Sequence, residues 1–278
     1  MPAHTNGRPD TWPRPLAFAL SGGGSWGASQ VGMLRALTEA GIRPDLVVGT
    51  SVGALNGAVV SAHPDDAADR LDEVWRAIDQ ATVFGGSRRR AVVTFLRSRG
   101  SHLSEPDSLQ RLVANHLPVT EIEDLRLPLS IVVTDAATGE VVLLNRGRAD
   151  RALMASTAIP GIFPSVTIDG REFIDGGVAA NVPIRPALRT GAATVVVLDA
   201  TPNQIARPSN RPVGRLLNTA SLMLRSQAAT DTEDLAPDRL VVRLPRATPD
   251  GYGSFNFNGT ADLIDRGHRL TTDFLARL

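Results

Sequence analysis

Twice within its first 62 residues, the chain passes from a short apolar run through small residues into a helical pattern. The first unit joins Leu16–Leu20 to a helix expected at Gly27–Ala40. The second joins Leu46–Gly49 to a helix expected at Gly53–Ala62. Strands that alternate with helices in this way predict an α/β fold, in which helices cover the faces of a sheet.

The same alternation continues along most of the remaining chain. Further strands are predicted at Leu129–Thr134, Val141–Asn145, Val195–Asp199 and Leu240–Leu244. Further helices are predicted at Asp66–Asp79, Ser108–Leu117, Ala149–Ser156, Pro183–Thr190, Arg215–Thr230 and Ala261–Leu278. Because we find no internal repeat and no convincing linker, we expect a disordered tail at residues 1–14 and one domain over residues 15–278.

The composition excludes several classes of function. The sequence has no cysteine, so disulfides, thiolate nucleophiles and cysteine-ligated zinc are excluded. All 29 basic residues are arginine, so the chain lacks the lysine that Schiff-base chemistry or a P-loop needs. The formal net charge is zero, which argues against a nucleic-acid partner bound by broad phosphate neutralisation.

The N-terminal residues carry no apolar segment of the kind found in signal peptides. No window of the sequence offers the roughly 20 continuous apolar residues that a membrane span requires. We therefore expect a soluble, cytoplasmic protein, and no residue pattern points to an oligomeric state.

Three consecutive glycines follow the first predicted strand, at Gly22, Gly23 and Gly24. Glycines at the start of a helix let backbone N–H groups point into a cavity, where the helix dipole favours negative charge. Together with Gly27 they satisfy the G-x-G-x-x-G pattern of a dinucleotide site, but the same geometry also suits an oxyanion hole. A tight turn between strand and helix is the third explanation.

The second strand separates these explanations. A dinucleotide site expects an acidic residue at its end, to hold the ribose, and none is present there. The strand runs instead into Gly49-Thr50-Ser51-Val52-Gly53, which is a G-x-S-x-G nucleophile elbow between a strand and a helix. The elbow places the Ser51 side chain at the start of a helix, beside the Val52 N–H, and marks Ser51 as a candidate nucleophile.

A nucleophilic serine needs a base, and none of the histidines stands in a catalytic context. His116 ends a predicted helix, where a cation is ordinary surface chemistry, and His268 lies in an exposed-looking stretch of the last helix. For each of the five we expect a structural role, although a triad that includes His268 remains the closest alternative: His4, His63, His102, His116 and His268.

Asp175 is the stronger candidate for the base. Asp169-Gly170 predicts a hairpin turn between Val166–Ile168 and Arg171–Ile174, and the returning strand delivers Asp175 at its end. Gly176 and Gly177 follow, so the chain can turn without side chains crowding the carboxylate. The alternative is a solvated aspartate in a loop, but the apolar pair before Asp175 favours a buried strand end.

These motifs together resemble those of the patatin-like phospholipases, in the family's order. The resemblance covers about residues 16–200 and rests on the glycine turn at 22–27, the elbow at Ser51 and the turn at 175–177. Residues 152–166 and 181–183 also resemble the segments on either side of the family's aspartate motif.

The resemblance implies a three-layer α/β/α sandwich with a mostly parallel sheet. It implies that Ser51 is the nucleophile and that Asp175 activates it with no histidine. It also implies that N–H groups around Gly22, Gly23 and Gly24, with that of Val52, bind the oxyanion. The family commonly has arginine or lysine where this chain has Trp26, so we expect Trp26 to contact substrate at a more apolar mouth.

The activity expected from these residues is hydrolysis of a fatty-acyl ester of a lipid or phospholipid through an acyl-enzyme, with no metal or cofactor. Two other classes stay open, a dinucleotide-binding protein and a catalytically silent lipid-binding module. A lipid substrate also requires contact with a lipid surface. Residues 87–99 carry arginines around an apolar middle, which suits a peripheral membrane contact and a lid over residues 82–107. A short core helix with solvated ends fits the pattern as well.

Overall fold

The computed structural model describes residues 8–78, 119–203, 239–254 and 256–278. Within these ranges, eight strands form one sheet in the order β5-β6-β3-β2-β1-β7-β8, with β4 also paired to β3. The five strands from β3 to β8 along this order are parallel, and β4, β5 and β6 add antiparallel pairs at one side. The strands are β1 Leu16–Leu20, β2 Leu46–Thr50, β3 Leu129–Asp135, β4 Val141–Leu144, β5 Val166–Ile168, β6 Arg171–Asp175, β7 Thr194–Leu198 and β8 Leu240–Arg243.

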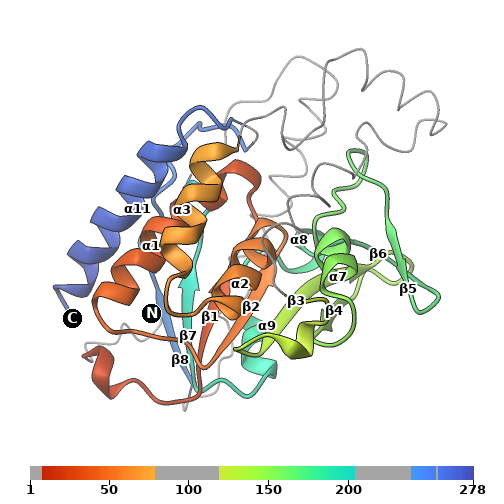
Figure 1. Cartoon of the computed structure of the whole chain (residues 1–278), viewed down its shortest axis with the longest axis horizontal. Helices are drawn as coiled ribbons and strands as arrows, with labels where there is room; N and C mark the ends of the chain where they lie inside the picture. The colour runs from red at the N-terminus through yellow and green to blue at the C-terminus, as the bar shows by residue number, and fades with distance from the viewer. Residues whose placement is uncertain (1–7, 79–118, 204–238, 255) are drawn as a thin grey trace.

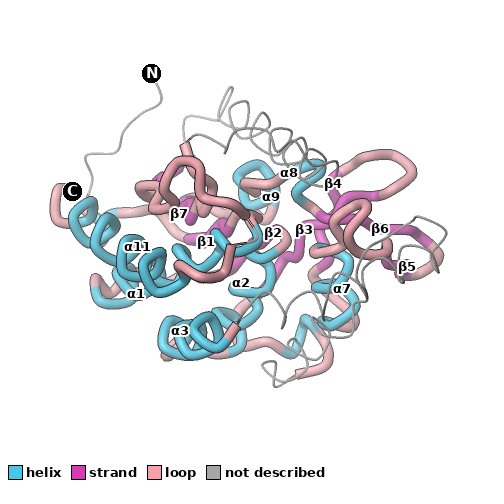
Figure 2. The backbone as a smooth tube through the Cα atoms, turned by 90° about the horizontal axis from the view of Figure 1, so that it is seen from above, coloured by secondary structure: helices cyan, strands magenta, loops and turns pink. Residues whose placement is uncertain are grey.

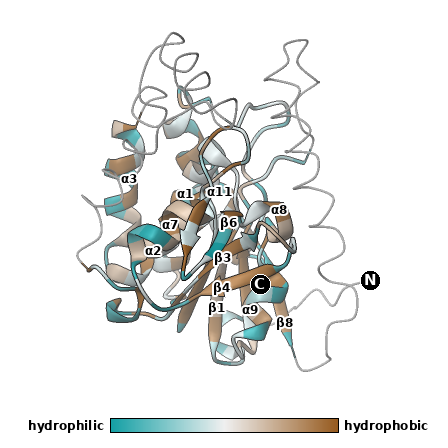
Figure 3. Cartoon of the chain, turned by 90° about the vertical axis from the view of Figure 1, so that its right-hand side faces the viewer, coloured by the Kyte–Doolittle hydropathy of each residue, from teal (hydrophilic) through white to brown (hydrophobic). Residues whose placement is uncertain are grey.

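Helices cover both faces of this sheet, as the view from above in Figure 2 shows. One face carries the larger layer, which consists of α1 Ala28–Glu39, α2 Val52–Ala62, α3 Ala67–Ala77, α7 Ala149–Ser156 and α11 Thr260–Leu275. The other carries the short helices α8 Gly177–Ala180 and α9 Ile184–Arg189. The predicted three-layer α/β fold with a mostly parallel central sheet is thus confirmed, and the strands at the centre of the sheet are hydrophobic (Figure 3).

The two cores follow from the alternation of side chains along each strand. In β1, the large side chains of Leu16, Phe18 and Leu20 lie in the core beneath the larger helical layer. Ala17 and Ala19 point to the opposite face, into the core beneath α8 and α9. Burial of one large apolar side chain contributes about 1.5–3 kcal/mol, so both faces of the central strands stabilise the fold. A strand buried on both faces reads as a continuous apolar run, as β1 does.

Several predicted features lie outside the described residues. They are the helices at 108–117 and 215–230, and the arginine-rich segment 87–99 with its surrounding stretch 82–107. Among the described helices, none combines the length and the apolar character needed to cross a membrane.

Candidate active site

Ser51 occupies a sharp turn between β2 and α2. Its backbone dihedral angles are φ 53° and ψ −123°, and a positive φ is uncommon for a residue with a side chain. Such a conformation costs of order 1–3 kcal/mol, so the surrounding structure must impose it. The Ser51 carbonyl accepts hydrogen bonds from the N–H groups of Ala54 and Leu55, which ties the turn to the first turn of α2.

Close packing of β1, β2 and α2 explains the small residues that flank Ser51. A Cβ atom on Gly49 would lie 2.4 Å from the Gly53 carbonyl oxygen. A Cβ atom on Gly53 would lie 2.3 Å from the Leu20 carbonyl oxygen, at the end of β1. No side chain fits at either position, so the glycines of the G-x-S-x-G pattern allow the backbone contact that forms the elbow.

Ser156, the last residue of α7, holds the elbow from the other side. Its hydroxyl accepts a hydrogen bond from the Ser51 N–H at 2.8 Å and donates one to the Val132 carbonyl at 2.7 Å. The Ser156 side chain is fully buried, so water does not compete for these bonds. Sequence reasoning did not assign Ser156 this role, because nothing in its local sequence indicates a partner 105 residues away.

Asp175 meets Ser51 because two strands end against neighbouring residues of β3. The last residue of β2, Thr50, pairs with Val132, and the last residue of β6, Asp175, pairs with Val133. β4 pairs with residues of β3 that also pair with β2 and with others that also pair with β6. A strand has only two edges, so β4 lies along one edge of β3, and β2 and β6 share the other edge. The two strand ends therefore face each other at one point of the sheet.

An ion pair joins the antiparallel strands β3 and β6. Arg171, the first residue of β6, binds the Asp135 carboxylate at the end of β3 through two N–H groups, at 2.7 and 3.1 Å. The guanidinium also lies over the Phe173 ring, 5.2 Å from its centroid. Because the arginine holds the pKa of Asp135 below its usual range, this carboxylate stays ionised and the pair persists near neutral pH. The pair thus ties the start of β6 to the end of β3.

The Ser51 hydroxyl donates a hydrogen bond of 2.7 Å to Asp175 Oδ2. The other carboxylate oxygen, Oδ1, accepts the Gly177 N–H at 2.7 Å. Burial of the Asp175 side chain raises its pKa from the ordinary 3.8 to about 6, although the hydrogen bonds from Ser51 and Gly177 act in the opposite direction. The carboxylate is thus ionised near neutral pH and is more basic than an exposed aspartate, as a general base requires.

The two histidines in the described residues have other environments. His268 Nε2 lies 2.7 Å from Glu39 Oε2, so this ring pairs with a carboxylate at the end of α1. His63 follows α2, and burial together with the neighbouring Arg70 lowers its pKa. Neither forms a hydrogen bond with Ser51 or Asp175, and the other three histidines lie outside the described residues.

The glycine turn lies beside Ser51, since a Cβ atom on Gly22 would lie 3.3 Å from Ser51 Cβ. Within the described chain, no hydrogen bond occupies the N–H groups of Gly23, Gly24 and Val52. The Gly22 N–H differs from these, because it donates to the Asn181 carbonyl at 3.0 Å. Of the four residues predicted to form the oxyanion hole, three therefore keep an N–H group that no described residue binds, and Gly22 instead anchors the loop.

Trp26, predicted to contact substrate, has only 4% of its surface exposed. Its indole Nε1 donates to the Tyr252 carbonyl at 2.9 Å, and a Cβ atom on Gly23 would lie 3.1 Å from the indole ring. The Ser25 N–H adds a bond of 2.8 Å to the Ser254 carbonyl. Trp26 thus joins the glycine turn to the segment before α11, and its contact with substrate stays a prediction.

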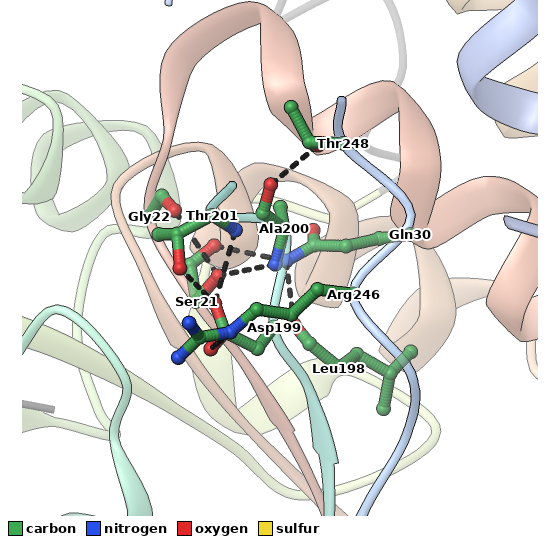
Figure 4. A network of polar contacts seen from close by, with 9 residues as sticks. All are labelled: Ser21, Gly22, Gln30, Leu198, Asp199, Ala200, Thr201, Arg246 and Thr248. Atoms are coloured by element: carbon green, nitrogen blue, oxygen red, sulfur yellow. Dashed lines mark hydrogen bonds and ion pairs between the residues drawn. The ribbon is translucent and has the colours of Figure 1, made fainter. Parts of the chain in front are cut away.

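A buried polar network joins the start of the glycine turn to α1 and the end of β7 (Figure 4). The Gln30 side chain of α1 donates to the carbonyls of Ser21 and Leu198, at 2.9 and 3.0 Å, and so ties the ends of β1 and β7 together. The Ser21 hydroxyl accepts the Ala200 N–H at 2.9 Å and donates to the Gly22 carbonyl at 3.1 Å. Each polar group is paired, so the network rigidifies the turn.

Asn56 extends this network into the helical layer. It donates to Gln30 Oε1 at 2.8 Å and to the Gly27 carbonyl at 3.0 Å, and it accepts a bond of 3.0 Å from the Trp75 indole. The helices α1, α2 and α3 are therefore held together by the same side chains that fix the end of β1.

Comparison with known proteins assigns the chain to a family. The profile of the patatin-like phospholipases matches residues 18–188, more than half of the chain. The chain belongs to the patatin-like phospholipase family. An uncharacterised protein of the NTE family from Mycobacterium tuberculosis is 32% identical over 228 residues, which cover 76% of this chain and 59% of the relative. The chain thus matches less than two thirds of the length of this mycobacterial relative.

Other proteins are similar to part of this chain in sequence or in fold. Patatin-like phospholipase domain-containing protein 7 of Rattus norvegicus is 30% identical over 66% of this chain and 13% of its own length. Lysophospholipase NTE1 of Mycosarcoma maydis is 27% identical over 66% of this chain and 10% of its own length. The crystal structure of VipD from Legionella pneumophila shares the fold, with a TM-score of 0.50 and 15% identity over 95% of this chain and 67% of VipD.

In this patatin-like domain, replacement of Ser156 by alanine should weaken the elbow. The Ser51 N–H and the Val132 carbonyl would both lose their buried partner, and such a loss costs about 1–3 kcal/mol. Chemical denaturation should show this decrease in the free energy of unfolding. Ser61→Ala is the matched control, because the Ser61 hydroxyl is also buried but has no partner among the described residues. Equal stability of the two variants would contradict the role assigned to Ser156.

Replacement of Asp175 by asparagine should stabilise the protein above pH 6. Because the pKa of Asp175 is raised, the folded state binds this proton more tightly than the unfolded chain does. The stabilisation of the folded state by this bound proton is complete below pH 3.8 and is lost as pH rises to about 6. At pH 8 the ionised, buried carboxylate then costs on the order of 3 kcal/mol, which asparagine avoids. The difference in unfolding free energy between variant and parent should therefore be larger at pH 8 than at pH 4.5, and a difference independent of pH would contradict the raised pKa.

Proposed function

We propose that the chain is a serine acyl hydrolase that cleaves fatty-acyl ester bonds of lipids or phospholipids through an acyl-enzyme, with Ser51 and Asp175 as a catalytic dyad. The observation that carries this proposal is the hydrogen bond of 2.7 Å from the Ser51 hydroxyl to the buried carboxylate of Asp175. Membership of the patatin-like phospholipase family supports the substrate class, as does the name of the related lysophospholipase.

In the first half of the reaction, Asp175 takes the proton of the Ser51 hydroxyl as Oγ forms a bond to the ester carbonyl carbon. The carbonyl oxygen becomes an oxyanion, which the N–H groups of Gly23, Gly24 and Val52 bind. When this intermediate collapses, the bond to the alcohol oxygen breaks and Asp175 returns its proton to the leaving alcohol. Ser51 then carries the acyl group.

In the second half, Asp175 takes a proton from a water molecule whose oxygen attacks the acyl carbon. Collapse of the second intermediate breaks the bond to Ser51, the proton returns to the serine oxygen, and the fatty acid leaves. Asp175 can act in both halves because it is ionised before each proton transfer. We further propose that residues 15–278 form a single catalytic domain that meets lipid substrates at the membrane surface from the cytoplasm.

Replacement of Ser51 by alanine should abolish both hydrolysis of p-nitrophenyl acyl esters and labelling by a fluorophosphonate probe. The probe reacts with an activated serine, so peptide mapping identifies the nucleophile directly. Circular dichroism should show that the variant keeps its fold, because alanine removes no hydrogen bond other than the one to Asp175. Label found on Ser21, Ser25 or Ser156 instead would contradict the assignment.

Replacement of Asp175 by asparagine should lower turnover by about a hundred- to ten-thousand-fold, the range typical for loss of a general base. In the parent enzyme, kcat/KM should decline as pH falls below about 6, because protonation removes the base. His268→Ala is the control, since this ring pairs with Glu39 and not with the dyad. A folded but inactive His268→Ala protein would replace the dyad by a triad.

A further inference from the structure

Asn181 is a buried residue whose side chain has no hydrogen-bond partner in the part of the chain that the structure describes. Only 2% of its surface is exposed, and neither Oδ1 nor Nδ2 forms a hydrogen bond with another described residue. Buried amide groups in folded proteins are nearly always paired, so an unpaired one requires an explanation. The catalytic steps described above do not use this residue.

The backbone of Asn181 is fixed by the two segments that build the active site. The Thr50 hydroxyl, next to the nucleophile, donates to the Ala180 carbonyl at 2.8 Å. The Gly22 N–H, in the glycine turn, donates to the Asn181 carbonyl at 3.0 Å. The end of α8 is therefore tied to both β2 and the glycine turn, and the Asn181 side chain has a defined position.

That position lies beside the nucleophile. A Cβ atom on Gly22 would lie 2.4 Å from Asn181 Oδ1 and 3.3 Å from Ser51 Cβ. Asn181 Oδ1 and Ser51 Cβ can therefore be no farther apart than the sum of these two distances, which is 5.7 Å. Rotation of the carboxamide about its Cβ–Cγ bond exchanges its oxygen and its NH2 group, so the NH2 group can take the position of Oδ1.

We propose that Asn181 is a further catalytic residue, whose side-chain NH2 group donates a hydrogen bond to the oxyanion. The proposal rests on the acyl-hydrolase function proposed above. Because the Gly22 N–H is already bound to the Asn181 carbonyl, the glycine turn lacks one donor, and the Asn181 carboxamide, which lies against Gly22, can supply another. A donor that is unpaired in the free enzyme forms its bond only as charge develops on the substrate, so it favours the transition state over the ground state.

Replacement of Asn181 by leucine, which has a similar shape, tests this assignment. The leucine variant keeps the backbone carbonyl that binds Gly22 and loses no side-chain hydrogen bond to the described residues. We expect kcat for p-nitrophenyl acyl esters to fall by about a hundred- to a thousand-fold, as for removal of one oxyanion donor, with KM nearly unchanged. The rate of labelling by a fluorophosphonate should fall as well, because its phosphonyl oxygen occupies the oxyanion hole. The melting temperature should not decrease.

Thr271→Val is the matched control. The Thr271 hydroxyl is also fully buried and unpartnered among the described residues, but it lies on α11 and is not part of the proposed site. This variant should keep both kcat and labelling rate. Full activity of Asn181→Leu would overturn the proposal, and so would a loss of activity that follows a lower melting temperature. A fall in turnover with an unchanged labelling rate would assign Asn181 to deacylation alone and overturn it too.

The test separates this proposal from the proposed function. Parent protein that is labelled at Ser51, with an Asn181→Leu variant labelled at the same rate, would remove Asn181 from the mechanism and leave the Ser51 hydrolase in place. Parent protein that neither hydrolyses esters nor reacts with the probe would overturn both.

Discussion

The arrangement of the site depends on one edge of β3, where two strands of opposite direction end against each other. β2 runs parallel to β3 and ends beside Val132, whereas β6 runs antiparallel and ends beside Val133. β2 and β6 therefore meet head to head, and a hydrogen bond of 2.7 Å joins Ser51, the residue after β2, to Asp175, the last residue of β6. A slip of the hairpin by one residue would turn the carboxylate to the opposite face of the sheet. The ion pair of Arg171 with Asp135 opposes such a slip.

The turn and most of the strands and helices around this site could be predicted from local sequence patterns. The Asp169-Gly170 turn between β5 and β6 is confirmed, with both residues at positive φ, and the strands β1 and β5 and the helix α7 begin and end at the predicted residues. Other boundaries differ by one to three residues: β7 begins at Thr194 and not at Val195, and α11 ends at Leu275 and not at Leu278. The helix α8 was not predicted, because a four-residue helix after two glycines leaves no periodic pattern.

The supporting residues could not be found in this way, because their partners are distant in the sequence. Ser156 binds the elbow across 105 residues, and Gln30 binds the end of β7 across 168. Asn181 stands in a segment that was noticed for its resemblance, but its unpaired carboxamide becomes visible only when Gly22 lies against it. Sequence patterns report which face of an element is buried. They do not report which buried polar group meets which.

The basicity of Asp175 depends on what surrounds it as much as on its burial. A guanidinium near a carboxylate lowers its pKa, as Arg171 does for Asp135. Arg246 binds another carboxylate, that of Asp199, which directly follows β7. The Arg246 Nε donates to it at 2.7 Å (Figure 4). Among the described residues, no cation contributes to the pKa of Asp175, and only the hydrogen bonds from Ser51 and Gly177 oppose the effect of burial. An arginine placed beside Asp175 would hold the carboxylate ionised but would make it a weaker base. The dyad proposed for Ser51 and Asp175 requires the opposite, a carboxylate that is kept away from positive charge and has a pKa close to neutral pH.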